Sequence, residues 1–260
     1  MGSVLRVIYS GLKAESAGLM ADRADFFISV VLIFVGELIF PMITLLIYSS
    51  GASFPGWDLH QVLLLQGIFL LSKGVVDLLF SGVIFNTLER VREGTFDLLL
   101  IKPRGTLFMA MVTGINLRSV GSLLSGLLVF SYGVMQNTEI LPAHIPMFFF
   151  MFILSLSVLF SFTIISAAVV FKWVGNSRIF ELFSSVNQFA LYPRGIFSRT
   201  TQSIISYIIP ISTISFYPAS VLLGKSAEGI VPGALTAVLF LGFSLGLWKI
   251  MLKNYTSAGG

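Results

Sequence analysis

Residues 88–105, LERVREGTFDLLLIKPRG, form a charged island in an otherwise apolar chain. Seven of these eighteen residues are charged, whereas only 11% of the 260 residues are charged and 56% are hydrophobic. A soluble domain of this length needs far more polar surface to cover its core. Burying seven charges in a bilayer would cost about 20 kcal/mol on insertion scales, so the island must meet water. The composition therefore predicts an all-α polytopic membrane protein, with residues 1–260 as a single domain.

Apolar stretches on both sides of the island are long enough to cross roughly 30 Å of hydrocarbon. Pro41 predicts a kink in the first span, and Arg118 blurs the start of the third. With one span assigned to the segment 180–223, six transmembrane helices are expected. The other five spans are expected at about 26–48, 62–85, a stretch ending near 135, 145–171 and 230–248.

The distribution of Lys and Arg predicts the orientation. The amino terminus has three of these residues, the island four, the loop after the fourth span two, and the carboxyl tail two. The loops after the first and third spans have none. Because cytoplasmic loops are enriched in Lys and Arg, both termini and the island are expected in the cytoplasm.

The segment 180–223 has two interpretations. One places a fifth span near 180–197, followed by a broken, partly re-entrant stretch on the outer side, and the Pro-interrupted sequence favours it. The other places Arg194 and Arg199 in a cytoplasmic loop and the span at 203–223, and the charge rule favours it.

Residues 1–25 lack the continuous apolar segment of a signal peptide. Val4, Leu5, Ile8 and Leu12 fall at helical spacing, which predicts an amphipathic helix in the cytoplasmic interface. The alternative is a frayed tail.

Several motifs are absent or fail on context. The chain has no cysteine, which excludes disulfides and cysteine-ligated metals. Residues 219–226, ASVLLGKS, fit a loose phosphate-loop pattern, but they follow an apolar stretch and not a strand, so Lys225 is expected in a turn outside the membrane. His60 and His144 lie near the outer ends of spans, and neither belongs to a zinc-binding motif. Gly242 and Gly246 form a G-x-x-x-G pattern, which has low specificity.

Charged residues within the spans are expected to pair, because each costs about 2.5–3.5 kcal/mol at mid-bilayer. Lys73 and Asp77 are four residues apart on one helix face, and Glu37 lies at a similar depth in the neighbouring span. Arg118, near the start of the third span, is the fourth charged residue expected within the spans. A structural ion pair and a proton relay or substrate contact are both open interpretations.

The island contains residues typical of helix starts and helix ends, which indicates a folded element. Thr87 is expected to cap a short helix through LERVRE, and Gly94 fits its C-terminal stop. Thr95 is expected to cap a second turn, FDLLL, that ends before Pro103. Exposed apolar residues among these charges, namely Phe96, Leu98 and Leu99, indicate a docking site for another protein.

Three stretches carry a family resemblance. REGTFDLLLIKP, residues 92–103, is similar to the loop between the second and third spans of type-2 ATP-binding-cassette (ABC) exporter permeases. LYPRGIF, followed by IIP and FYPAS, resembles the fifth-to-sixth region of the same branch. LWKIMLKNYTSAG, residues 247–259, is similar to its terminal signature.

The resemblance implies a permease subunit whose coupling helix, within 86–105, seats in a cytoplasmic ATPase subunit. It implies a second permease chain, ATP and magnesium on the ATPase and none here, no nucleic-acid partner, and a place in the bacterial inner membrane. It also favours the first interpretation of 180–223. The expected ATPase contacts are Glu89, Arg90, Arg92, Glu93, Gly94, Thr95, Phe96, Asp97 and Leu98, with Phe96 and Leu98 as anchors.

Two other classes remain alternatives. An ion- or proton-coupled carrier would use Glu37, Lys73 and Asp77, and a membrane scaffold would transport nothing. The residues determine neither the substrate nor the direction of transport.

Overall fold

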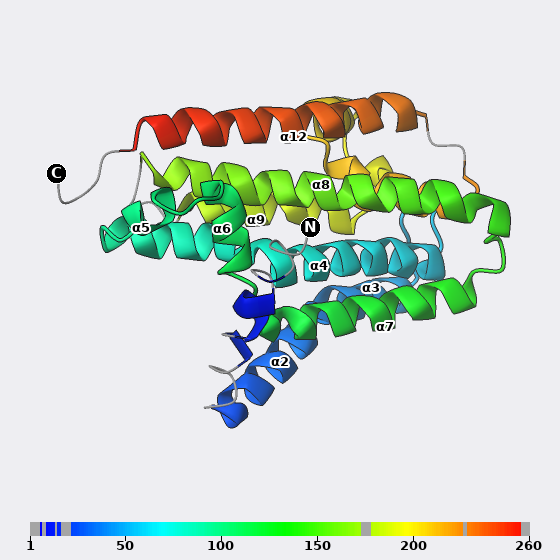
Figure 1. Ribbon diagram of the computed structural model, residues 1–260. Helices are drawn as coiled ribbons and strands as arrows, with labels where there is room; N and C mark the ends of the chain where they lie inside the picture. Colours follow the sequence, from blue (N-terminus) through cyan, green and yellow to red (C-terminus); the bar gives the residue numbers. More distant parts are fainter. Residues whose placement is uncertain are drawn as a thin grey trace.

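The computed structural model describes residues 6, 9–13, 15–16, 22–172, 178–225 and 228–255, and within them every regular element is helical (Figure 1). Five helical segments are long and apolar enough to cross a membrane, and a bent pair of helices would make a sixth. This agrees with the predicted all-α membrane fold. The long elements are α2 (Arg23–Glu37), α3 (Ile39–Ser49), α4 (Leu59–Arg92), α7 (Val120–Gln136), α8 (Ile145–Val170) and α12 (Ile230–Lys253).

Helix α4 lies at the centre of the bundle (Figure 1). It packs against α7 on one side and α8 on the other, while α2 covers α7 and α12 covers α8. Its residues 61–70 are all buried, which explains why the sequence there has no polar face. By contrast, α2 contains no buried residue.

The bundle has two distinct ends. The island lies at the left in Figure 1, and we call this the island end. At the opposite end, the Lys225 ammonium donates to the Gly56 carbonyl oxygen at 2.8 Å, and Gln61 donates to Glu139 at 3.2 Å. The first bond joins the α3–α4 connection to the segment between α11 (Phe216–Leu222) and α12, and the second joins the first turn of α4 to the α7–α8 connection. We call these three connections together the far end.

The first span is broken at Leu38, between α2 and α3. Pro41 explains the break, because it has no N–H to donate to the carbonyl of Glu37 four residues earlier and its ring clashes there. The predicted kink is therefore confirmed, and it leaves Glu37 at the end of a helix segment.

Glycines allow α4 and α7 to approach closely. A Cβ atom added at Gly67 or Gly74 of α4 would come closer than 3.0 Å to the backbone of α7, and one at Gly126 or Gly133 would meet α4 in the same way. Both pairs are seven residues apart, so they repeat on one helix face. A Cβ atom added at Gly242 or Gly246 would meet nothing within 4 Å among the described residues, so the pattern noted in the last span marks no close helix approach there.

A loop bonds to the backbone of α4 near its middle. The Gly82 N–H donates to the Gly114 carbonyl at 3.0 Å, and the Leu78 carbonyl accepts from Asn116 N–H at 3.0 Å. Leu78 and Gly82 are i and i+4 partners in a regular helix. The segment 114–116, which follows α6 (Thr106–Val112), therefore engages both groups of one helical turn.

The segment between α8 and α12 is the least regular part. It contains α9 (Arg178–Asn187), α10 (Arg199–Ser203) and α11 (Phe216–Leu222), joined by 3-10 and π turns. The pair 199–208 and 211–222 is bent by 74°. Serine hydroxyls provide hydrogen bonds to backbone carbonyl groups that this irregular segment leaves without helical partners. Ser155 donates to the Ile214 carbonyl at 2.6 Å, and Ser215 donates to the Ala190 carbonyl.

Both ends of the bent pair lie at the far end. Before the pair, the Tyr192 ring contacts the Phe54 ring of the α3–α4 connection, with centroids 5.9 Å apart. After it, Lys225 bonds to Gly56 of the same connection. The Arg194 guanidinium lies 5.1 Å from the Phe216 ring centroid and bonds to Tyr217, so aromatic rings hold this charge.

Part of the predicted amphipathic segment 1–25 is described. Arg6, residues 9–13 and residues 15–16 are helical, and Gly11 lies close against Val112 at the end of α6. Residues 1–5, 7–8, 14 and 17–21 lie outside the described residues.

Candidate functional site: the island and the intramembrane charges

The island begins inside α4, because this helix runs without interruption to Arg92. The prediction that Thr87 caps a separate short helix is therefore wrong. Thr87 is fully buried within α4, and its hydroxyl has no hydrogen-bond partner among the described residues. Packing of the apolar residues of the second span stabilises α4, and the helix therefore continues through the first charged residues of the island.

Gly94 ends α4 as predicted. Its φ of +69° is left-handed, a region that favours glycine. The Thr95 N–H donates to the Arg90 carbonyl at 2.8 Å and the Gly94 N–H to that of Val91 at 3.3 Å, which is a Schellman motif. The chain therefore turns sharply as it leaves α4.

A four-residue helix, α5 (Asp97–Leu100), follows the turn. Its N-cap residue is Phe96, without a side-chain cap, so the prediction that Thr95 caps this turn is wrong. The helix ends before Pro103, as predicted.

Phe96 holds the island to the bundle. Its ring contacts Phe171 at the end of α8 with centroids 4.9 Å apart, and Tyr255 after α12 at 5.2 Å. Trp248 of α12 completes this aromatic cluster by contacting Phe171 at 5.1 Å. The prediction that Phe96 anchors the island in a partner is therefore wrong, because its side chain is 0% exposed.

The outer surface of the island carries other apolar side chains. Leu98, Leu100 and Ile101 are 53%, 43% and 77% exposed, whereas Leu99 is buried beside Phe96. Of the other residues expected to contact a partner, Glu89, Arg92 and Glu93 are exposed, and Arg90, Gly94, Thr95 and Asp97 are half-buried.

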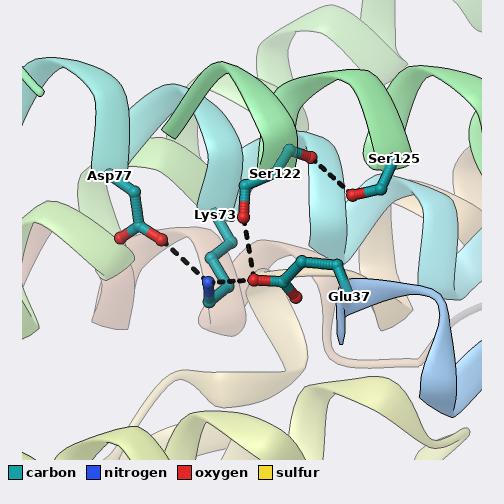
Figure 2. A network of polar contacts seen from close by, with 5 residues as sticks. All are labelled: Glu37, Lys73, Asp77, Ser122 and Ser125. Atoms are coloured by element: carbon teal, nitrogen blue, oxygen red, sulfur yellow. Dashed lines mark hydrogen bonds and ion pairs between the residues drawn. The ribbon is translucent and has the colours of Figure 1, made fainter. Parts of the chain in front are cut away.

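The second candidate site is the charge network within the bundle (Figure 2). The Lys73 ammonium lies 2.5 Å from a Glu37 carboxylate oxygen and 2.8 Å from an Asp77 oxygen. Both predicted pairs, one along α4 and one between neighbouring spans, are confirmed. The side chains of Glu37, Lys73 and Asp77 are 20%, 33% and 37% exposed.

A third span joins this network through Ser122 of α7. Its hydroxyl donates to the Glu37 oxygen at 2.8 Å, and Ser125 donates in turn to the Ser122 carbonyl (Figure 2). The sequence did not single out Ser122, because serine is common in transmembrane helices and its partner is distant in the chain. The network ties α2, α4 and α7 together.

Arg118 lies apart from the network. Its guanidinium forms an ion pair with Asp25 at 2.5 Å, and these side chains are 45% and 50% exposed. Asp25 belongs to the first turn of α2, so the pair lies at a span end and not in mid-bundle.

At the far end, Lys225 is held by the protein itself. Its ammonium donates to Gln61 Oε1 at 2.6 Å and to the Gly56 carbonyl, and it lies 4.4 Å from the Trp57 ring centroid. Burial lowers the pKa of Lys225, against the opposing charges of Asp58 and Glu139. Because Gly224 follows α11 and does not open a helix, this loop cannot act as a phosphate loop.

Among the described residues, no group of three or more His, Cys, Asp or Glu side chains could hold a metal ion. His60 and His144 both lie at the far end and are half-buried.

Comparison with known proteins gives one match. The family model described as ABC-2 family transporter protein matches residues 31–259. Neither the curated proteins nor the solved structures include a match to this chain.

Proposed function

The chain belongs to the ABC-2 transporter family, and from this premise we propose that it is the permease subunit of an ABC exporter. In this proposal residues 1–260 form one permease domain in a bacterial inner membrane. A second permease chain completes the transport pathway, and separate cytoplasmic subunits bind ATP and magnesium. Family membership makes the chain an integral membrane permease; the partners, the direction and the compartment are the proposal.

The observation that carries the proposal is the two-sided construction of the island. Phe96 and Leu99 point into the bundle, and Leu98, Leu100 and Ile101 point out of it. A short helix with an exposed apolar face beside exposed charges suits a groove in a partner protein.

The aromatic cluster gives the island a route into the membrane helices. Phe96 contacts Phe171 at the end of α8 and Tyr255 after α12, and Phe171 in turn contacts Trp248 of α12. Because packed aromatic rings resist separation, a displacement of the island by an ATPase would carry these helix ends with it. We infer that ATP-driven closure of two ATPases moves two islands together and switches the pathway between its inward- and outward-facing states.

The charge distribution supports a cytoplasmic island end. The far end contains Arg194, Arg199 and Lys225 but no Lys or Arg in residues 50–58 and 137–144, whereas the island alone contains four. Lys172 after α8 and Lys253 at the end of α12 add to the excess at the island end. The contacts of Tyr192 and Lys225 with the α3–α4 connection support a fifth crossing that ends near residue 192. Residues 199–222 would then enter from the far end and return to it, with both termini of the chain in the cytoplasm.

Exposed apolar surface supports a second permease chain as well as lipid contact. Large side chains on α2 and α3, including Phe27, Leu32 and Leu46, are 67–68% exposed. Lipid tails can cover part of this surface, and helices of a second permease chain can cover the rest.

The carrier alternative is not favoured. Among the described residues the network contains three charged side chains and ends at Ser122 and Ser125. A proton relay needs a continuous chain of titratable or hydrogen-bonding groups across the bundle.

Reconstitution with the ATPase that co-purifies with the full chain tests the proposal. The double variant Leu98→Asp, Ile101→Asp should lose ATPase binding, because charges replace the exposed apolar face while the buried cluster stays intact. Leu141→Asp at the far end, where Leu141 is 55% exposed, is the matched control and should bind normally. Equal ATPase binding by both variants would exclude the island as the contact.

A further inference from the structure

A cavity lies beside the charge network. It has a volume of about 240 Å³ and is bounded by side chains of α2, α3, α4, α8 and α9. Its polar wall includes Glu37, Lys73 and Asp77, and its apolar wall includes Phe69, Phe162 and Phe183. A pocket with apolar walls and a few convergent polar groups is the usual form of a small-molecule site.

The charges around the cavity do not balance. Two carboxylates face one ammonium, so one negative charge is uncompensated among the described residues, whose contribution to the cavity lining includes no other charged side chain. The Glu37 carboxylate accepts from both Lys73 and Ser122. Asp77 accepts from Lys73 alone among the described residues and is the more exposed of the two carboxylates, so it faces the cavity with free acceptor capacity.

Two further acceptors in the cavity wall lack partners. Ser81 Oγ and Asn187 Oδ1 are buried atoms without a hydrogen bond among the described residues. Ser81 is four residues after Asp77, so both lie on one face of α4, and Asn187 comes from α9. Buried polar atoms without partners are uncommon in folded proteins, and they mark a place where a hydrogen-bond partner is missing. The Asn187 oxygen accepts only, and the Ser81 hydroxyl accepts or donates.

These groups define the missing ligand. One uncompensated carboxylate requires one positive charge, and three free acceptors require several hydrogen-bond donors. A primary ammonium carries three donors and one charge, whereas a quaternary ammonium carries none. The volume is slightly below the ~300–1,000 Å³ of sites for drug-sized ligands, so it fits a headgroup and its first carbons.

We propose that this cavity binds the primary ammonium headgroup of an amphiphile, with Asp77, Ser81 and Asn187 as its acceptors. The phenylalanine rings surround the first part of the apolar body. The inference that the bound amphiphile is a transported substrate rests on the proposed function. The inference that the cavity binds an ammonium headgroup does not depend on it. Both a free alkylamine and an aminophospholipid carry this headgroup.

Calorimetric titration of the full chain in phosphatidylcholine nanodiscs tests the proposal, with empty nanodiscs subtracted. Dodecylammonium should bind about tenfold more tightly than dodecyltrimethylammonium, a factor that corresponds to about 1.4 kcal/mol. Dodecyl sulfate should bind most weakly. Equal affinities for the three probes would overturn the proposal.

Two variants assign the binding to this cavity. Asp77→Asn should weaken dodecylammonium binding about tenfold, and Asp25→Asn, which removes a carboxylate outside the cavity, should not. Ser81→Ala disturbs no hydrogen bond of the described residues, so it probes the cavity without risk to the fold. Ser81→Ala should weaken dodecylammonium binding severalfold, whereas Ser125→Ala should leave it unchanged. If Asp77→Asn and Ser81→Ala both bound dodecylammonium as tightly as the unaltered chain, the proposal would be overturned.

A second bilayer distinguishes the sources of the headgroup. Phosphatidylethanolamine in the nanodisc should abolish dodecylammonium binding if the lipid occupies the site, and unchanged binding would assign the site to a non-lipid amine. Because no ATPase is present, these results are independent of the proposed function. Specific binding together with failure of ATP-driven transport would refute the exporter and leave the site intact.

Discussion

The intramembrane network and the island contain the same kinds of charged residue but use them in opposite ways. Within the bundle, Glu37, Lys73 and Asp77 pair with one another and join three helices. At the island, several charged side chains remain at the surface, and the buried ring of Phe96 attaches the element to the bundle. In the bundle the charged residues satisfy one another between helices, whereas at the island buried apolar packing attaches the element and the charged residues stay at the surface.

The largest expected effect comes from Phe96→Ala. Removing a fully buried ring leaves a cavity beside Phe171 and Tyr255, and such a change costs about 4 kcal/mol. Chemical unfolding of the variant in detergent measures the loss. Leu99→Met, which conserves volume in the same cluster, should cost less than about 1.5 kcal/mol, and an equal effect of both variants would refute the packing role of the ring.

The network should respond strongly to Lys73→Met. The variant leaves two carboxylates without their cation, and the cost should be about 3 kcal/mol, at the low end for a broken buried pair because these side chains are partly exposed. Thermal unfolding in nanodiscs measures it.

The triple variant Glu37→Gln, Lys73→Met, Asp77→Asn is the matched control for this loss. It removes every charge together and should recover most of the stability. If the triple variant were less stable than Lys73→Met, unpaired charge would not be the cause.

Ser122→Ala should have an intermediate effect. The Ser122 hydroxyl donates to the Glu37 carboxylate at 2.8 Å, and loss of a hydrogen bond to a charged group costs about 1.5 kcal/mol. Ser157→Ala, whose hydroxyl bonds only to its own helix backbone, provides the comparison by the same unfolding assay. In the Glu37→Gln background the effect of Ser122→Ala should shrink; an unchanged effect would contradict the assignment.

The smallest effect on stability is expected for Leu98→Ala. Its side chain is 53% exposed, so the free energy of unfolding should change by less than about 0.5 kcal/mol. ATPase binding should nevertheless weaken, as measured by co-purification. A loss of stability comparable to that of Phe96→Ala would remove the distinction between the two faces of the island.

Several local sequence patterns predicted the local structure, although the expected Thr95 cap is absent. The position of Pro41, the four-residue spacing of Lys73 and Asp77, and Gly94 as a helix stop all act within one or two helical turns. The extent of the fourth span also agreed, with a candidate span at Pro142–Val170. These features depend on the backbone geometry of neighbouring residues, which a single sequence records.

Contacts between distant segments could not be predicted in this way. Thr87 predicts a helix start because threonine caps helices, but the packing of the whole second span keeps the helix continuous. The charged residues around Phe96 indicate a surface position, whereas Phe171 and Tyr255, which are distant in the chain, cover its ring. Nothing near Ser122 in the sequence indicates Glu37 as its partner.

The bonds between α4 and segment 114–116 constrain the order in which the protein is assembled. The Leu78 carbonyl and the Gly82 N–H reach their final partners only after Gly114 and Asn116 have been synthesised. Unpaired backbone groups are costly in lipid. Until the third span arrives, the Leu78 carbonyl and the Gly82 N–H must therefore remain in the translocon, bond to water or bond to other groups. The second and third spans therefore mature as one unit during translation, whereas the island between them reaches its final packing only after Phe171 and Tyr255, which cover Phe96, have been synthesised.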